Sequence, residues 1–313
     1  MKTYWSTSKS SRQVVIDNRY ERYFPTAEFS KYDAFLAAAG EVFKSEFRTK
    51  IVIIRRSTDK ADGGTPHSFV LKIYYYPPIP GIRTGLQRSK AEREFYGLRF
   101  LAGHGVPTVE PVAFGVERTR LGFVRSCFVV TRLLDDSVNL AQWRSESLER
   151  SAGSDPEMQV VLKQLGSIFR RFHQENFFLF TAKPKNILIR SQSIGSPEIF
   201  LVDVPYCRTL RPSSLARWGQ RRDLGMFFAN FRPSLSESDI AAFYDGYLPD
   251  PLGSSEAALY AQVHRAVRSK HHETPISALL HQLNLALKSK MLLLAPMLAD
   301  TLLDCLSDWL IPG

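Results

Sequence analysis

Two short apolar strands, each with a polar side chain at one end, restrict the fold of this chain more than any other feature. The segment 181–189 has the sequence TAKPKNILI, in which Asn186 stands directly before a predicted strand. A second apolar strand, 199–202, is followed by Asp203, and the polar residues between the two strands predict a hairpin. Carboxylate and amide oxygens at strand ends are ligands that Mg²⁺ accepts. Alone, each of these two residues is a weak signal, because Asp and Asn are common at strand ends.

Length and composition predict a globular chain with two compact parts. The 313 residues are 44% hydrophobic and 23% charged, which argues against intrinsic disorder. The three cysteines lack C-x-x-C spacing, which argues against a zinc site and a disulfide framework and fits a reducing compartment. The start lacks the apolar stretch of a signal peptide, and the longest apolar run, 291–298, is too short to cross a bilayer. We therefore expect a cytoplasmic protein.

The formal net charge of +10 predicts an anionic partner. A basic surface suits phosphorylated lipid, membrane headgroups or nucleic acid. Aromatic residues do not interleave with the basic runs, so we expect no nucleic-acid partner. The alternative is a basic soluble protein without a special partner, because net charge contains no information about geometry.

The first part of the chain is predicted to be rich in strands and the rest rich in helices. Runs of β-branched and apolar residues predict strands over 50–55, 69–74 and 123–134. Apolar residues at helical spacing predict helices over 88–102 and 159–174. From about residue 220 the remainder is mostly helical by the same criterion.

The boundary between the two parts is expected near Asp135. We predict an α+β fold with an N-terminal lobe over 1–135, which consists of a small antiparallel sheet and one helix. The C-terminal lobe over 136–313 is predicted to be mostly helical. A stripe of apolar residues at helical spacing over 276–310 is expected to be core of the helical lobe, and the alternative is a stripe that lies on a membrane.

Lys72 and Glu94 are charged residues in apolar surroundings, which predicts that they pair. Lys72 stands in the apolar strand, and a buried lysine needs an anionic partner. In the first predicted helix, Glu94 shares the core-facing stripe with Leu98, whereas Glu92 falls on another side. The alternatives are an edge-strand lysine that points into water and a boundary glutamate with its tip in solvent.

The order Lys72, Glu94, Asn186 and Asp203 resembles the phosphate-binding and metal-binding set of the protein-kinase-like fold. More specifically, the chain resembles the bacterial lipopolysaccharide core kinases that phosphorylate Kdo or heptose. This resemblance covers roughly residues 40 to 250. The stretches that carry it are PIP at 78–80, RSKAEREF at 88–95, GVPT at 105–108 with EP at 110–111, FH at 172–173, RW at 217–218 and RDL at 222–224.

The resemblance implies a two-lobed kinase-like protein that uses ATP and Mg²⁺. Lys72 would contact the ATP phosphates, Glu94 would anchor this lysine, and Asn186 and Asp203 would bind the metal. Asp223 resembles the aspartate that braces the catalytic loop, and the alternative is a simple acid at a helix N-terminus.

The resemblance also implies where adenine and the acceptor would lie. Adenine would lie against the segment that contains Val130, Leu133 and Leu134. The basic surface would face an anionic lipid-linked sugar of the lipopolysaccharide core, or an envelope protein. The expected location is therefore the cytoplasm, at the surface of the inner membrane.

The sequence departs from the family pattern where the catalytic aspartate is expected. The D-x-x-x-x-N spacing places Thr181 there, and a threonine hydroxyl cannot take a proton as a carboxylate does. Such a group contributes about 10²–10⁴-fold to a rate, but phosphate transfer depends mainly on positioning and electrostatics, so its loss need not abolish transfer. The first lobe also lacks G-x-G-x-x-G, and the glycine-poor run 40–45 is the candidate for a turn over the phosphates.

Three functions are compatible with this pattern. The first is an ATP-dependent sugar kinase of the lipopolysaccharide core that is slow or has a relocated base. The second is a pseudokinase that acts as a regulatory or scaffolding protein in envelope biogenesis. The third is a kinase fold with other transfer chemistry, such as nucleotidyl transfer. Product formation that Asp203→Ala abolishes would favour an enzyme, and equal behaviour of wild type and variant in cells would favour a non-catalytic role.

Overall fold

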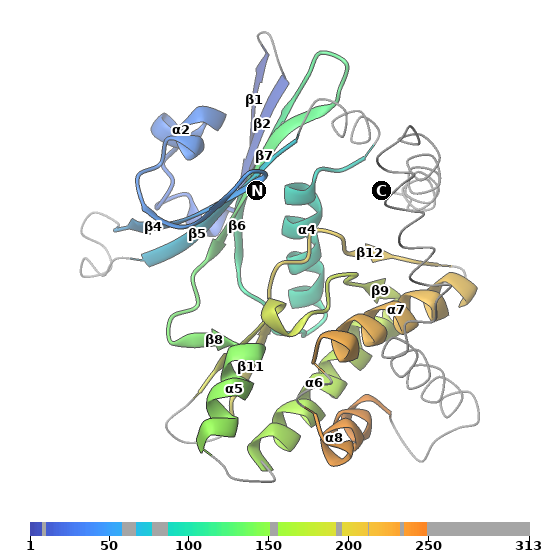
Figure 1. The fold of residues 1–313 in the computed structure, drawn as a ribbon. Helices are drawn as coiled ribbons and strands as arrows, with labels where there is room; N and C mark the ends of the chain where they lie inside the picture. Colours follow the sequence, from blue (N-terminus) through green and yellow to red (C-terminus); the bar gives the residue numbers. More distant parts are fainter. Residues whose placement is uncertain are drawn as a thin grey trace, which may run out of the picture. The chain divides into compact units, whose positions relative to one another are not determined.

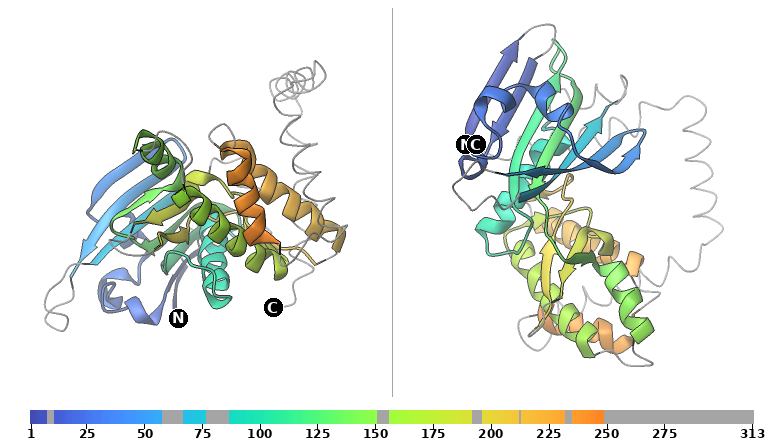
Figure 2. Two further views of the ribbon diagram at one scale, coloured as in Figure 1. Left: turned by 90° about the horizontal axis from the view of Figure 1, so that it is seen from below. Right: turned by 90° about the vertical axis from the view of Figure 1, so that its left-hand side faces the viewer.

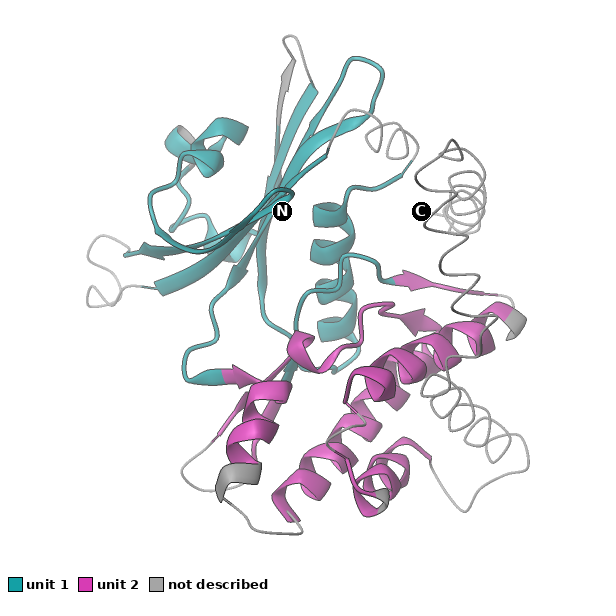
Figure 3. Cartoon of the chain, viewed as in Figure 1, with its two compact units in different colours: residues 1–137, 200–207 teal, residues 138–199, 208–313 magenta. Residues whose placement is uncertain are grey.

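The structure is a computed structural model of the 313-residue chain. It describes residues 1–7, 11–57, 67–76, 87–150, 156–191, 196–211, 213–231 and 235–248. The chain divides into two compact units, which are residues 1–137 with 200–207 (unit 1) and residues 138–199 with 208–313 (unit 2) (Figure 3). The PIP stretch at 78–80 and the apolar stripe over 276–310 lie outside the described residues.

Unit 1 contains a seven-stranded sheet in the order β1-β2-β6-β7-β5-β4-β3, in which all neighbouring strands are antiparallel. Its strands are β1 (Lys2–Thr7), β2 (Ser11–Ile16), β3 (Glu41–Glu46), β4 (Thr49–Arg56), β5 (His67–Tyr75), β6 (Pro111–Arg118) and β7 (Val124–Arg132). Its helices are η1 (Asn18–Tyr20), α1 (Thr26–Phe29), α2 (Tyr32–Leu36) and α4 (Lys90–Gly103).

Both faces of this sheet are covered by helices (Figures 1 and 2). Because side chains alternate along a strand, Leu71 of β5 packs with Phe35 of α2 on one face. On the other face, Val129 of β7 packs with Phe95 of α4. The sequence analysis expected one helix here and was wrong in missing the short helices α1 and α2. Helices of one turn are too short to show a helical period.

Residues 200–207 belong to unit 1, although the sequence analysis assigned them to the C-terminal lobe. The Leu201 N–H donates to the Pro107 carbonyl oxygen at 3.0 Å. Gly97 lets α4 come close to this stretch, because a Cβ at Gly97 would overlap the Cys207 sulfur. The stretch is therefore fastened to α4 within unit 1.

Unit 2 is mainly helical. Its helices are α5 (Leu140–Arg150), α6 (Pro156–Gln174), η2 (Pro184–Asn186), α7 (Ser213–Phe231) and α8 (Glu237–Tyr247). Its short strands are β8 (Ser137–Asn139) and β10 (Ile187–Arg190), which join β11 (Glu198–Leu201) in one sheet, and β9 (Phe177–Phe178), which pairs with β12 (Arg208–Thr209). Rings of α6, α7 and α8 form the core, in which Phe169, Phe227 and Phe243 contact one another. Among the described residues, no helix is both long and apolar enough to span a membrane.

Candidate functional site

Lys72 lies in an interior strand of unit 1. Strand β5 is flanked by β4 and β7, which excludes the alternative of an edge-strand lysine. The Lys72 Nζ forms an ion pair with the carboxylate of Asp203 and another with Glu94 Oε1 at 3.8 Å. The Lys72 and Glu94 side chains are only 14% and 4% exposed. The structure thus brings three of the predicted site residues together within one unit. We refer to Lys72, Glu94 and Asp203 as the Lys72 cluster.

The charges in this cluster stabilise one another. Burial alone would lower the pKa of Lys72, but the carboxylates of Glu94 and Asp203 outweigh burial and raise it. Lys72 is therefore positively charged at neutral pH. Burial raises the pKa of Glu94, and the nearby Lys72 charge opposes this shift.

Glu94 has a second partner, which the sequence analysis missed. The Tyr74 hydroxyl donates to Glu94 Oε2 at 2.6 Å, and burial, followed by the charge of Glu94, raises the pKa of Tyr74 well above its usual value. Tyr74 stands two residues after Lys72 and hence on the same strand face, which is the signal that could have identified it. Glu92 instead closes a capping box at the start of α4, where it accepts from the Ser89 N–H at 2.6 Å.

Asp203 follows β11 in an unusual backbone conformation. Its φ of 55° lies in the left-handed region, which costs a non-glycine residue about 1–3 kcal/mol and is typical of functional sites. Its carboxylate supplies the hard oxygen atoms that Mg²⁺ prefers. Among the described residues, no group of three or more His, Cys, Asp or Glu could hold a metal ion. A Mg²⁺ at Asp203 would therefore take further ligands from phosphate and water, as is usual for this ion.

Val130 and Leu133, the two residues expected beside adenine, differ in accessibility. The Val130 side chain is fully buried in the core on the α2 face of the sheet, which closes it to a ligand. Leu133 is half-buried just after β7, and its N–H donates to the Ser68 carbonyl oxygen at 2.9 Å. Leu133 is the better candidate of the two.

The run 40–45, expected to form a turn over the phosphates, is mostly strand. Residues Glu41–Glu46 form β3, and the turn into β4 lies at Phe47 and Arg48. Pairing with β4 outweighs the weak strand propensity of this polar run. Phe47 is 87% exposed, and the Arg48 guanidinium lies 6.0 Å from its ring centroid.

In unit 2, Asp223 holds the backbone of the loop that precedes Thr181. Its carboxylate is fully buried and accepts from the N–H groups of Leu179 and Phe180, each at 2.7 Å. His173 lies 3.4 Å from the same carboxylate. Helix α7 begins at Ser213, so Asp223 lies within the helix and the alternative of an N-terminal acid is excluded.

Thr181 and Asn186 are bonded to their own loop in unit 2. The Thr181 hydroxyl donates to the Leu179 carbonyl oxygen at 3.3 Å, and the Thr181 carbonyl oxygen accepts from Asn186 Nδ2 at 2.9 Å. A cation would therefore be ligated through the Asn186 carboxamide oxygen rather than through its nitrogen. Both residues belong to unit 2, whereas the Lys72 cluster belongs to unit 1.

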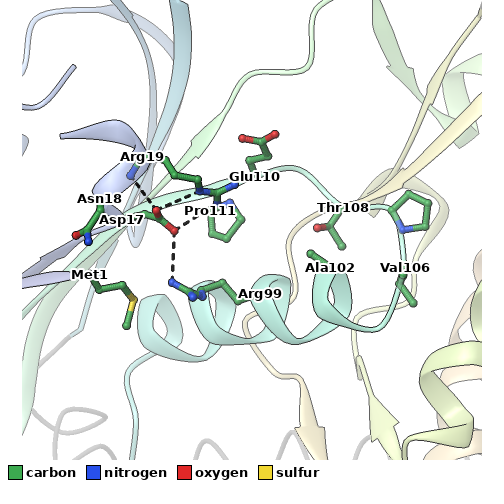
Figure 4. A pocket seen from close by; sticks show the side chains of 12 residues that line it. Met1, Asp17, Asn18, Arg19, Arg99, Ala102, Val106, Thr108, Glu110 and Pro111 are labelled. Carbon is green, nitrogen blue, oxygen red and sulfur yellow. Dashed lines mark hydrogen bonds and ion pairs between the residues drawn. The ribbon is translucent and has the colours of Figure 1, made fainter. Parts of the chain in front are cut away.

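Unit 1 also holds a cavity of about 670 Å³ between the turn after β2 and the C-terminal half of α4 (Figure 4). Asp17 in this cavity accepts from Arg19 at 3.2 Å and from Arg99 at 3.4 Å. Burial would raise the pKa of Asp17, but the two arginines outweigh burial and lower it. None of the predicted site residues lines this cavity.

The fold and the Lys72 cluster define a protein with a kinase-like fold. A solved structure described as WaaP in complex with acyl carrier protein has a TM-score of 0.61 to this chain, at 19% identity over 82% of this chain and 98% of that one. The family model described as the lipopolysaccharide kinase (Kdo/WaaP) family matches residues 81–247, which is over half of the chain. The chain belongs to this family, which confirms the resemblance seen in the sequence.

One curated relative is the lipopolysaccharide core heptose(I) kinase WaaP of Escherichia coli. It is 24% identical over 168 residues, which make up 52% of this chain and 61% of that protein. The match thus spans less than two thirds of the relative's length.

Proposed function

We propose that this chain binds MgATP through Lys72 and Asp203. The observation that carries the proposal is the cluster in which the largely buried Lys72 is held by Glu94 and Asp203. A lysine fixed in this way offers a positioned cation to phosphate oxygens, and the adjacent carboxylate offers a ligand to Mg²⁺. When bound, the metal would neutralise charge on the phosphates. Asn186 would be the second protein ligand of the metal, and Leu133 would contact adenine.

We propose further that the chain transfers phosphate to a hydroxyl of a Kdo-type or heptose-type lipid-linked sugar. Family membership supports this acceptor class. The transfer would be slow, because Thr181 stands where a carboxylate would take the proton of the acceptor hydroxyl. The remaining catalysis would come from positioning and from the charges of Lys72 and the metal.

A second candidate function is that of a pseudokinase that uses MgATP as a structural ligand. The specific observation in its favour is that the Thr181 hydroxyl donates to the Leu179 carbonyl oxygen of its own loop. A threonine hydroxyl does not take a proton as a carboxylate does, and this one is engaged within its own loop. The chain would then act as a regulatory or scaffolding protein in envelope biogenesis.

The proposed partners follow from charge and from the relatives. The net charge of +10 suits an anionic lipid-linked sugar and an anionic membrane surface, so we place the chain in the cytoplasm at the inner membrane. The solved WaaP structure is in complex with acyl carrier protein. A protein partner is therefore a further proposal for this chain.

The nucleotide proposal is tested by thermal unfolding of the purified chain with ATP, with MgATP and with neither. A ligand that binds only the folded state stabilises it, by about 2.7 kcal/mol at a hundredfold excess over its dissociation constant. We expect stabilisation that depends on Mg²⁺ and is lost in Asp203→Ala.

The matched control is Asp33→Ala, which removes an exposed carboxylate of unit 1 and should retain the full stabilisation. Equal stabilisation of wild type and Asp203→Ala would overturn the assignment of the metal site. With binding established, transfer of labelled γ-phosphate to a Kdo-containing core lipid separates the two functions. Labelled core lipid accumulates if the chain is a sugar kinase, and none accumulates if the chain is a pseudokinase.

A further inference from the structure

Four side chains of unit 2 form a surface that the proposed nucleotide site does not use. They are Phe180, Trp218, Arg208 and Arg222, and we refer to them as the arginine–aromatic platform. The Phe180 and Trp218 rings are 5.4 Å apart between centroids, at an interplanar angle of 38°. The guanidinium groups lie over these rings, with Arg208 at 5.2 Å from the Phe180 centroid and Arg222 at 5.5 Å from the Trp218 centroid.

The platform is held in place by buried groups. Phe180 has a φ of 56°, in the left-handed region that a bulky residue rarely enters, and its N–H is held by the buried carboxylate of Asp223. Gly219 lets α7 approach β9, because a Cβ at Gly219 would lie 2.6 Å from the Phe178 ring. This close packing sets Trp218 beside Phe180 (α7 and β9 in Figure 1).

The platform combines exposed apolar surface with positive charge. Trp218 is 46% exposed, although an indole ring is normally withdrawn from water. Arg222 is exposed too, and within the described part of the chain no carboxylate forms an ion pair with it. A flat aromatic face next to guanidinium groups fits a ring that carries an anionic group, because guanidinium matches the planar geometry of a carboxylate.

We propose that the arginine–aromatic platform binds the acidic sugar of the lipid-linked acceptor. The sugar ring packs against Trp218, and its carboxylate accepts hydrogen bonds from Arg208 and Arg222. Phe180 directly precedes Thr181 in the chain, so a sugar on the platform lies next to the loop that carries the degenerate catalytic position. The assignment rests on the proposed function for the identity of the acceptor, and it adds the residues that recognise it.

The test measures binding of the full chain to detergent micelles that contain Kdo₂-lipid A, by isothermal titration calorimetry. Wild type is compared with Arg222→Ala and Trp218→Ala, and the matched control is Arg221→Ala, an exposed arginine on the same helix. Both platform variants should weaken binding about tenfold or more, the size expected for loss of a charge-assisted hydrogen bond or of aromatic packing. The control should bind like wild type.

Micelles of lipid A, which carry phosphates and acyl chains but no acidic sugar, distinguish the source of the anionic group. If the chain binds lipid A micelles only weakly, and Arg222→Ala leaves this weak binding unchanged, the acidic sugar is the group that the platform recognises. If Arg222→Ala weakens binding to both kinds of micelle equally, the assignment to the acidic sugar is overturned and lipid phosphate is the group recognised. MgATP stabilisation of the same variants separates this assignment from the nucleotide proposal. Loss of micelle binding with MgATP stabilisation intact supports the platform, and wild-type micelle binding in both variants overturns it whether or not MgATP binds.

Discussion

His173 is held between two partners that fix its protonation. A carboxylate only accepts hydrogen bonds, so Nε2 of His173 carries the proton toward Asp223, and Nδ1 accepts from the Tyr247 hydroxyl at 2.9 Å. Burial lowers the pKa of His173, although Asp223 acts in the opposite direction. The ring is therefore neutral in the folded chain, and it supports the aspartate that holds the loop backbone at Leu179 and Phe180.

We expect His173 to make the stability of the chain fall as the pH falls. Its folded pKa lies below the usual value of 6.5, so below pH 6.5 the unfolded chain binds a proton that the folded chain does not. As the pH falls below 6.5, the free energy of unfolding decreases by up to about 1.4 kcal/mol per pH unit. Above pH 6.5, His173 contributes no dependence of stability on pH. Urea unfolding between about pH 5 and 7 should show a smaller slope in His173→Gln than in wild type.

The matched control is His104→Gln, which replaces an exposed histidine at the end of α4 and should keep the wild-type slope. Glutamine at position 173 can still donate to Asp223, so the variant retains that contact. Identical slopes in wild type and His173→Gln would show that the ring takes up a proton in the folded chain as readily as in the unfolded chain, so that its pKa is not lowered.

Helix α4 carries Glu94, and at Gly97 the same helix packs against the stretch 200–207. A Cβ at Gly97 would overlap the Cys207 sulfur, whereas a Cβ at Gly103 meets nothing within 4 Å. The two glycines of this helix thus differ in packing, and Gly103 is in addition its last residue. Overpacking in a tight interior contact costs about 1–3 kcal/mol, which exceeds the gain of up to about 1 kcal/mol from replacing glycine by alanine in a helix.

We therefore expect Gly97→Ala to destabilise the chain by about 1–2 kcal/mol and to weaken Mg²⁺-dependent stabilisation by ATP, because the shifted stretch carries Asp203. Gly103→Ala should leave both quantities unchanged or slightly raised. Thermal unfolding of both variants with and without MgATP measures the two effects. Equal stability of the two variants would mean that α4 and the 200–207 stretch are not tightly packed.

The elements that the sequence predicted include those with long, regular patterns and the two short apolar strands β10 and β11. β-branched runs predicted β4 and β5, and apolar spacing predicted α4 and α6. Lys72 and Glu94 could be paired from the same patterns, because each places a charge on an apolar face. Tyr74 was missed only because a buried hydroxyl does not interrupt an apolar strand.

At the scale of the whole molecule, long-range packing could not be predicted from the sequence. Residues 200–207 join unit 1 through contacts such as that between Gly97 and Cys207, which are over a hundred positions apart and carry no local signal. The position of Asp203 beside Lys72 is a consequence of that packing. The order of the site residues along the chain could be compared directly with a family pattern. The unit to which each residue belongs could not be predicted, because tertiary contacts determine it.

The proposed phosphate transfer would draw on residues of both units, since Asp203 belongs to unit 1 and Thr181 to unit 2. If the missing carboxylate limits the rate, Thr181→Asp should increase transfer to a Kdo-containing core lipid by about 10²–10⁴-fold, the contribution of a positioned acid–base group. Thr181 is half-buried and lies in a loop, so the folded chain can accommodate aspartate there. The rate is measured from labelled γ-phosphate at saturating MgATP.

Thr181→Asn is the matched control, because it has the shape of aspartate but cannot take a proton, and it should not raise the rate. Adding Asp203→Ala to Thr181→Asp should abolish the gain, since the new carboxylate acts only on a substrate with bound metal. A Thr181→Asp chain that binds MgATP as wild type does and still transfers no phosphate would identify the protein as a pseudokinase. The loss of activity would then have causes beyond the threonine at position 181, and the Lys72 cluster would serve nucleotide binding alone.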